Sequence, residues 1–453
     1  DMEHSNSYNP FEYIRDDLGV LMMINCLIKN TNNGQKGGDP FWEKSETALL
    51  QALVFYLKDN KNIPDEDKNF TNVMKLLQAA EVNENDPNAQ SPLDKLFAKL
   101  EATDPNSIAV KQYKTFKMGA GKTLKSILIS CAVRLTVFNL KEIENLTMKD
   151  DLNLKSVGDE KTALFVVIPA ADDTYNFLVS MMYSQLFETL YYHAENECPF
   201  EYYIKEGNDV LAIARKNEKG DKYTERDAKR LLESIKRANV RRTKNNRYLL
   251  KARNFEKVFN TEEDAKKYQE KLQKATIQKG AIRLPYPVRF LLDEFANIGQ
   301  IPDFTKKLAT MRQYEISCTI ILQNLAQIKT MYKDDWESIV GNCDSFLFLG
   351  GQEYSTLEYI SKLLGKATIT NRGRSKNRSS KGGGSGLSWN QTGRNLLDPN
   401  EISTMPKDEC ILIINGMDPF YGKKYDLEKH PHFHESGDSP KGQKYVCKSE
   451  ILN

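Results

Sequence analysis

Two adjacent carboxylates that follow a short apolar run carry the clearest chemical signal in this sequence. The run Val288 to Leu292 leads directly into Asp293 and Glu294. Such a run is typical of a buried parallel strand. A carboxylate at its end can hold Mg²⁺, which prefers oxygen ligands, and a second can orient a water for attack on a γ-phosphate. We therefore predict Walker B chemistry, with Asp293 positioning Mg²⁺ and Glu294 as the hydrolytic carboxylate. The alternative is a core strand with an acidic turn.

Two further polar residues follow at spacings that fit the same sheet edge. Arg312 lies 18 positions after Glu294, and Gln323 lies 29 after it. Asp303 is a candidate helix N-cap, and the β-branched run Ile316 to Leu322 predicts the next strand. Gln323 is therefore expected where open α/β sheets bind ligands. The alternatives are a surface salt bridge for Arg312 and a strand-end hydrogen bond for Gln323.

With these residues in place, the chain resembles the conjugative coupling ATPases of type IV secretion, the TraG/TraD-like DNA-transfer proteins. The Asp-Glu pair and the spacing of Arg312 and Gln323 carry the resemblance, which covers most of the chain except roughly residues 197 to 283. Five further segments support it: Leu308 to Arg312, Ile321 to Asn324, Gly341 to Asp344, Tyr359 to Gly365 and Gly393 to Leu397.

The resemblance implies an α/β fold: a RecA-like parallel-sheet nucleotide-binding domain with an inserted all-α domain. It implies an ATPase with ATP and Mg²⁺ as ligands, bound by Asp293, Glu294 and Gln323. Arg312 would be an arginine finger that reaches the neighbouring subunit's γ-phosphate, and Gln323 would sense that phosphate. A finger acting in trans requires a ring, so a homohexamer is implied.

The same resemblance implies the partners and the location. The implied motor drives relaxase-bound single-stranded DNA into the secretion channel, with the relaxosome and type IV secretion channel proteins as partners. Its place is the cytoplasmic face of the bacterial plasma (inner) membrane, reached through an N-terminal membrane segment. We expect the present chain to be a soluble cytoplasmic fragment of such a protein.

The sequence holds no complete phosphate-binding loop. A Walker A motif has the form GxxxxGK[ST] between a strand and a helix. Gly121, Lys122 and Thr123 resemble its end, but Phe116 stands where the first glycine is needed. We predict that these glycines break or bend a helix. By the resemblance the true loop lies upstream, so we expect this chain to bind ATP poorly.

Composition fits a soluble globular protein of two or three domains. The chain has 453 residues, of which 40% are hydrophobic and 28% charged, with a net charge of +2. It contains no run of 18 apolar residues and no signal peptide. Its seven cysteines are scattered without a CxxC pair, which argues against a zinc ribbon and suits a reducing cytoplasm.

Helix and strand signals alternate along the chain. The dipeptides Asp39-Pro40 and Ser91-Pro92 are typical helix starts, and they open amphipathic stretches. Apolar runs at Leu164 to Pro169, Ser345 to Leu349 and Cys410 to Ile414 predict further strands, with parallel pairing because helices separate them. The predicted division of the chain is as follows: 1–11, a remnant of the nucleotide-binding domain; 12–150, all-α; 151–196, nucleotide-binding; 197–283, a basic, mostly helical insertion; 284–430, nucleotide-binding with a flexible loop at 371–392; and 431–453, a C-terminal tail.

Two basic segments are candidates for DNA contact. Residues 201 to 283 contain 23 Lys and Arg against 13 Asp and Glu, and Tyr248 and Phe255 lie among the cations. Spaced cations with aromatics suit a phosphate backbone with occasional base stacking. The alternatives are a structural or partner-docking insertion and a disordered surface loop. The candidate residues are Arg237, Arg241, Arg242, Lys244 and Arg247 in the insertion and Arg374 and Arg378 in the loop.

Three other functions compete with the coupling motor. Two are RecA-like motors: a double-stranded DNA translocase and a secretion-assembly ATPase. The third is a non-catalytic receptor that docks cargo or the relaxosome through its helical block. Hydrolysis of ATP distinguishes this receptor from the motors.

Overall fold

A computed structural model of the chain describes residues 5–31, 40–81, 90–119, 121–169, 174–198, 202–214, 225–243, 246–252, 255–280, 283–377, 384–440 and 442. Within these residues no single helix is long and apolar enough to cross a membrane. One pair, Gly121–Asn139 and Lys141–Thr147, passes that test by length and composition, but it is bent by 84°.

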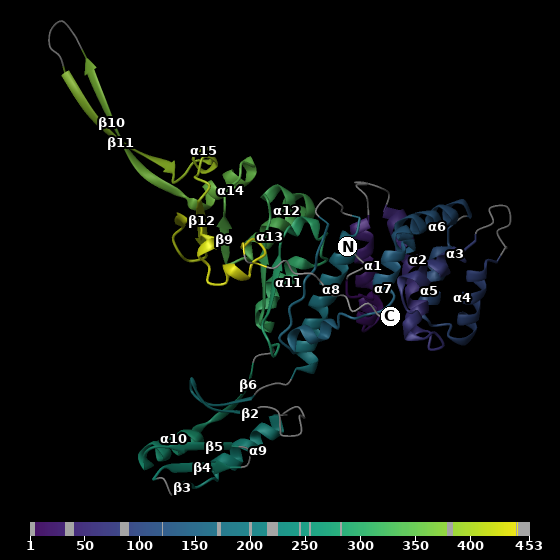
Figure 1. The fold of residues 1–453 in the computed structure, drawn as a ribbon, viewed down its shortest axis with the longest axis horizontal. Helices are drawn as coiled ribbons and strands as arrows, with labels where there is room; N and C mark the ends of the chain where they lie inside the picture. The colour runs from purple at the N-terminus through teal and green to yellow at the C-terminus, as the bar shows by residue number, and fades with distance from the viewer. Residues whose placement is uncertain are drawn as a thin grey trace.

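The N-terminal third is a bundle of helices (purple and blue in Figure 1). The serine of the Ser91-Pro92 start makes a capping box with Asp94, so this predicted helix start is confirmed; Pro40 also begins a helix, while Asp39 lies outside the described residues. The helices are α1 (Asp17–Thr31), α2 (Pro40–Asp59), α3 (Phe70–Gln78), α4 (Pro92–Thr103), α5 (Ile108–Lys117), α6 (Gly121–Leu135) and α7 (Lys141–Thr147).

The glycine-rich segment that resembles a phosphate-binding loop joins two helices of this bundle. Helix α5 ends at Lys117, and Gly121 begins α6, so Lys122 and Thr123 lie in a helical first turn. A phosphate-binding loop needs a strand before it, and a helix stands there instead. The prediction that these glycines interrupt a helix is confirmed.

A buried ion pair ties three helices of the bundle together. The guanidinium of Arg134 in α6 donates to the carboxylate of Glu46 in α2, with both side chains nearly inaccessible. Arg134 also donates to the carbonyl of Ile28 in α1 at 3.3 Å. Because α1 packs against both α2 and α8 (Asn176–Tyr192), the bundle and the neighbouring sheet share one continuous hydrophobic core.

The central sheet element is a parallel pair, β7 (Val288–Leu292) and β8 (Ile316–Ile320), which confirms both strand predictions. Helix α8 covers one face of the pair, where Phe187 stacks on Phe290 with ring centroids 4.3 Å apart. Helix α11 (Phe304–Thr310) makes the connection between the two strands. The carboxyl ends of β7 and β8 therefore point to the same edge.

The apolar runs predict strands buried on both faces, but the described part of the sheet is buried on one face only. In β7 only alternate residues are buried, and Leu291 is 65% exposed on the other face. The prediction of a paired strand at Leu164 to Pro169 is wrong, because these residues form no strand pairing with any other described part of the chain. Its alternate residues pack on the core, while Phe165 and Val167 are 86% and 89% exposed. Apolarity alone did not distinguish a strand buried on one face from one buried on both.

The C-terminal strands form a second sheet that is antiparallel. Strand β12 (Glu409–Ile414) pairs with β9 (Ser345–Phe348) on one side and with β13 (Phe420–Lys423) on the other. The strand positions are confirmed, but their predicted parallel pairing is wrong. A hairpin and a short helix intervene before β12, so no direct crossover fixes its direction. The helices of this region are α12 (Leu325–Tyr332), α13 (Trp336–Gly341), α14 (Tyr354–Leu364) and α15 (Pro399–Ser403).

The predicted flexible loop at 371–392 is instead largely a long β-hairpin. Strands β10 (Lys366–Asn377) and β11 (Gly384–Asn395) pair antiparallel over their full lengths. The hairpin projects from the body of the molecule (upper left in Figure 1). Its strands are polar and rich in glycine, so they lack the alternating apolar pattern that marks a strand.

The basic insertion is a small mixed α/β unit, so the prediction of a mostly helical segment is wrong. Two antiparallel three-stranded sheets, ordered β2-β1-β6 and β3-β4-β5, pack with two helices around their own hydrophobic cluster (bottom of Figure 1). Charged residues on the exposed faces of these short strands hid the alternation. The elements are β1 (Tyr202–Glu206), β2 (Asp209–Ala214), α9 (Glu225–Lys236), β3 (Val240–Arg242), β4 (Tyr248–Ala252), β5 (Phe255–Phe259), α10 (Glu262–Lys274) and β6 (Thr276–Lys279).

Candidate nucleotide-hydrolysis site

The two predicted carboxylates stand at the carboxyl end of β7. Backbone hydrogen bonds continue past the strand, since Ile321 donates to Leu292 at 2.9 Å and Phe295 donates to Ile321 at 3.1 Å. Between them Glu294 takes a left-handed conformation with φ of 49°. Its amide donates to the carboxylate of Asp293 at 3.0 Å. Both acidic side chains are thereby held exposed at the sheet edge.

Gln323 joins Glu294 from the neighbouring strand. Its side-chain amide nitrogen lies 3.2 and 3.1 Å from the two carboxylate oxygens of Glu294. The backbone amide of Gln323 donates to the side chain of Gln327 at 3.1 Å, which closes the turn into α12. The structure thus brings together two residues 29 positions apart, and it connects the carboxylate to the start of a helix.

The loop after the carboxylates is anchored by buried aromatic contacts. Phe295 is fully buried and stacks parallel to Tyr332 of α12, with ring centroids 5.8 Å apart. The Tyr332 hydroxyl accepts a hydrogen bond from the backbone amide of Ile301 at 3.1 Å. The loop and α12 are therefore packed as one unit beside the site.

Asn30, at the end of α1, clamps the same loop. Its side-chain oxygen accepts from the Gln300 amide at 2.6 Å, and its nitrogen donates to the Gln300 carbonyl at 2.9 Å. Gly299 has φ of +85°, and a Cβ there would lie 2.7 Å from the Asn30 oxygen. Ser180 of α8 also donates to the Gln300 carbonyl, at 2.6 Å. The sequence held no signal for Asn30 or Ser180, because both lie in helices far from the Asp-Glu pair.

Arg312 lies on a separate surface feature. It sits in the 3-10 turn Met311–Tyr314 that ends α11, with its side chain exposed. Within the described part of the chain it makes no ion pair, and it makes no hydrogen bond with Asp293, Glu294 or Gln323. Helix α11, which precedes this turn, is held by the buried Lys307, whose ammonium lies 2.6 Å from the carboxylate of Glu188 in α8. The salt-bridge alternative for Arg312 thus finds no partner among the described residues.

Three of the candidate DNA-contact residues gather at one hairpin of the insertion. Arg241 and Arg242 lie exposed on β3, the edge strand of its sheet, and Arg247 lies exposed just before β4. Arg242 donates to the side chain of Asn246 at 2.8 Å. Arg237 lies apart, exposed beyond the end of α9 and 3.7 Å from Glu233. Lys244 falls outside the described residues.

The two aromatic residues of the DNA-contact prediction are not openly exposed. Phe255 packs against the hydrophobic cluster of the insertion and Tyr248 is half-buried, so neither side chain is freely presented. On the projecting hairpin, Arg374 is exposed, and Arg372 lies 5.4 Å from the ring of the cross-strand Trp389. Arg378 falls outside the described residues.

Two protein-family models match the chain. The family described as "Type IV secretory system Conjugative DNA transfer" matches residues 1–201, and the one described as "TraM recognition site of TraD and TraG" matches residues 287–407. Conjugal transfer protein TraG of Escherichia coli is 30% identical over 163 residues, which is 32% of this chain and 25% of that protein. Protein VirD4 of Rhizobium radiobacter is 26% identical over 140 residues, which is 31% of this chain and 20% of that protein.

Solved structures show the same fold. The conjugative coupling protein TrwBdeltaN70 in an unbound form superposes with a TM-score of 0.54 at 13% identity, over 94% of this chain and 73% of that one. TrwB in complex with ADP and Mg²⁺ gives a TM-score of 0.52 at the same identity and coverage. Together with the strand-end carboxylates, this likeness defines an α/β protein with the RecA-like nucleotide-binding fold. The two family models place it further: the chain belongs to the type IV secretion coupling proteins, the TraG/TraD-like family.

Proposed function

We propose that the protein carrying this chain is the ATP-hydrolysing motor of conjugative type IV secretion. The observation that carries the proposal is the contact between Gln323 and Glu294 at the ends of two parallel strands. Ligands of open α/β sheets bind at that edge. An exposed carboxylate beside a side-chain amide suits hydrolysis of a γ-phosphate, which needs a group that orients the attacking water.

The side chains at this edge suit Mg²⁺ and a phosphate chain. Asp293 offers exposed carboxylate oxygens, the ligand type that Mg²⁺ prefers. When bound, Mg²⁺ supplies positive charge against the phosphate oxygens. Asp293 is the residue that would hold it. TrwB, a relative by fold, has been solved with ADP and Mg²⁺, which supports the same ligands here.

Glu294 and Gln323 have different roles in hydrolysis. Glu294 accepts a hydrogen bond from the attacking water and orients it. Gln323 holds the carboxylate in place, and its own backbone begins the turn into α12. The backbone amide of Leu325, the first residue of α12, donates to the hydroxyl of Thr356 in α14 at 3.0 Å. A change at the Gln323 side chain is therefore transmitted to two packed helices.

The wider function follows from the family. We propose a homohexamer that moves relaxase-bound single-stranded DNA toward the type IV secretion channel, docked to the relaxosome at the cytoplasmic face of the inner membrane. The matched family description names TraM recognition by TraD and TraG, which supports a relaxosome contact within residues 287–407. The exposed Arg312 supports a ring, since it is free to reach a neighbouring protomer.

The proposal is tested by DNA-stimulated ATP hydrolysis. In the complete protein, Glu294→Gln should lower the rate by about 100-fold or more, because it removes the group that orients water. Glu315→Gln is the matched control: it is an exposed glutamate before β8, at the opposite edge of the same sheet. Its rate should stay at the wild-type level. An inert wild type with DNA present would instead favour the docking receptor.

Charge reversal in the insertion tests the DNA contact. Arg241→Glu with Arg242→Glu should weaken single-strand binding and flatten its salt dependence, because fewer counterions are released. The matched control reverses Lys266 and Lys267, which pair with glutamates one turn away on α10. Affinity that stays unchanged in the first variant, or falls equally in both, would make the insertion a spacer.

A further inference from the structure

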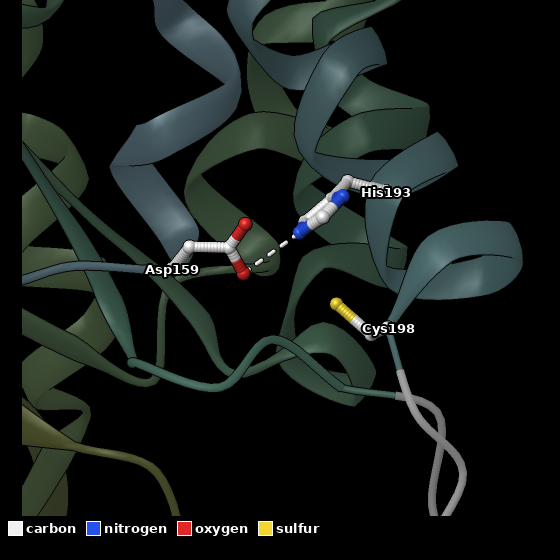
Figure 2. A group of neighbouring side chains, drawn as sticks. All are labelled: Asp159, His193 and Cys198. Atoms are coloured by element: carbon white, nitrogen blue, oxygen red, sulfur yellow. Dashed lines mark hydrogen bonds and ion pairs between the residues drawn. The ribbon is translucent and has the colours of Figure 1, made fainter. Parts of the chain in front are cut away.

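A second cluster of ligand-type side chains lies far from the sheet edge, where the insertion leaves the core. A carboxylate oxygen of Asp159, a ring nitrogen of His193 and the sulfur of Cys198 all lie within 4.8 Å of one another. Figure 2 shows the three groups converging on one space from two segments of the chain. No spacing in the sequence predicts this cluster, because Asp159 is 34 positions from the histidine.

An unusual helical turn brings two of the groups together. The last turn after α8, His193–Glu197, is a π-turn in which the amide of Cys198 donates to the carbonyl of His193 at 2.8 Å. In an α-helix, residues five apart lie on different faces, because each residue turns the chain by about 100°. The wider turn places His193 and Cys198 on one side. Single π-turns are frequent at functional sites.

The third group is fixed by a separate packed turn. Asp159 follows the 3-10 turn Leu154–Gly158, and the carbonyl of Gly158 accepts from Tyr286 at 3.0 Å. A Cβ on Gly158 would lie 2.8 Å from the side chain of Leu284. That close approach seats Asp159 beside the end of α8, with its side chain 44% exposed and able to rotate.

The histidine is oriented from both sides. Its Nε2 lies 2.8 Å from Asp159, and its Nδ1 lies 2.7 Å from the carboxylate of Glu197. The imidazole is only 12% exposed, and Cys198 is buried. A carboxylate behind the imidazole fixes the ring and makes the other nitrogen a better ligand, as in many metal sites.

We propose that Asp159, His193 and Cys198 bind one Zn²⁺, with Glu197 as the outer carboxylate. A nitrogen, a thiolate and a carboxylate oxygen are the donors that zinc takes, usually four in a tetrahedron, so one position stays open to water. Ligand atoms of such a site lie about 3.4–3.6 Å apart. The carboxylate of Asp159 must therefore withdraw from His193 by roughly 0.6 Å, which its exposure allows.

The ion would act as a structural clamp. Cys198 is the last described residue before β1 begins at Tyr202, so the site sits at the root of the insertion. Binding would tie the end of α8 to the turn that holds Asp159. This inference does not depend on ATP hydrolysis, and its site shares no residue with the sheet edge. The competing interpretation is a protonated imidazole held between two carboxylates without a metal.

Cobalt titration of the 453-residue chain at neutral pH tests the site, since Co²⁺ reports a thiolate ligand by a charge-transfer band. We expect one Co²⁺ per chain with that band, its displacement by Zn²⁺, and a higher Tm with Zn²⁺. Cys198→Ser should remove the band, and Glu197→Gln should weaken binding by about tenfold. Two control variants should keep the charge-transfer band: Cys343→Ser, which removes a thiol elsewhere in the chain, and Asp293→Asn, at the proposed magnesium site.

Two outcomes would overturn the proposal. One is a wild-type chain that shows no thiolate band at micromolar Co²⁺. The other is a band that survives Cys198→Ser. If wild type binds no metal while Asp159→Asn still lowers Tm, the cluster is an ion-paired imidazole clamp. Loss of ATP hydrolysis alone decides nothing here, because the metal titration is read independently of it.

Discussion

At the scale of residues, two glutamates in loops that follow strands have different surroundings. Glu294 receives hydrogen bonds from Gln323 at 3.2 and 3.1 Å and a longer one from Asn297 at 3.5 Å, and its carboxylate stays exposed at the sheet edge. Glu353 caps α14 instead. It accepts from the hydroxyl of Thr356 and from the backbone amides of Ser355 and Thr356, and these bonds lower its pKa to about 2. One carboxylate is saturated by its own helix, and the other is left available for chemistry.

The cap predicts a defined pH dependence of stability. Because the folded pKa of Glu353 lies below its unfolded value of about 4.3, its contribution is present above that value. It is lost as pH falls toward about 2. Glu353→Gln should therefore destabilise the protein by on the order of 0.5–1 kcal/mol near pH 7, and by less at pH 3. Urea unfolding at both pH values measures this.

A control on the same helix separates the cap from surface charge. The side chain of Glu358 is 46% exposed and pairs with Lys362 one turn away. Glu358→Gln should change stability only slightly, since exposed pairs of this kind contribute a few tenths of a kcal/mol. Equal losses in the two variants would mean that the hydrogen bonds at Glu353 add nothing beyond its charge.

At the scale of elements, the loop after the carboxylates depends on a distant helix. Asn30→Ala removes both hydrogen bonds to Gln300 and leaves the partly buried Gln300 amide unpaired, while the Gln300 carbonyl keeps its bond from Ser180. We expect a loss of about 1–3 kcal/mol in the free energy of unfolding and slower ATP hydrolysis, although among the described residues Asn30 makes no hydrogen bond with Asp293 or Glu294. Denaturant unfolding and hydrolysis rates measure the two effects.

The matched control is Asn25→Ala, the same substitution at an exposed position of α1. It should leave both quantities near their wild-type values. If Asn30→Ala kept the wild-type hydrolysis rate while losing stability, the clamp would be structural only and would not position the site.

Local patterns in the sequence predicted the elements that carry the site. Strands β7 and β8 were predicted from apolar runs, and Gln323 was placed at the edge shared with Glu294 by topology alone. The helical reading of Gly121 to Thr123 followed from the absence of a preceding strand. For the two strands and for the start of α6, the deciding pattern lies in the element and its immediate neighbours.

The features that the sequence did not predict share a physical cause. The β10–β11 hairpin and the strands of the insertion are stabilised by pairing between polar segments. Such segments lack the alternation of apolar and polar residues by which a strand is predicted. The cluster of Asp159, His193 and Cys198 and the Asn30 clamp depend on contacts between distant segments. Such contacts depend on how the whole chain packs, so the spacing of residues along the sequence does not predict them.

At the scale of the whole molecule, the exposure of Arg312 predicts a site shared between protomers. In a closed ring with head-to-tail interfaces, about a quarter of the sites in a one-to-one mixture of Arg312→Ala and Glu294→Gln would regain both groups. Each variant alone should hydrolyse ATP poorly, because an arginine finger contributes about 10³-fold or more. The mixture should therefore recover part of the wild-type rate.

The control mixes Arg312→Ala with a Glu294→Gln, Arg312→Ala double variant, which offers no intact finger. No recovery is expected there. Recovery absent from both mixtures, with ring assembly demonstrated, would place Arg312 in its own protomer's site or on a surface without a catalytic role.

The central claim is that Glu294 and Gln323 act as one unit at the ends of β7 and β8. A double-mutant cycle of ATP hydrolysis rates with Glu294→Gln and Gln323→Ala tests it most directly. We predict that each single variant is slow and that the double variant is no slower than Glu294→Gln alone, because groups acting as a unit are not additive. Rate losses that simply multiply, or a Gln323→Ala variant at the wild-type rate, would contradict the account.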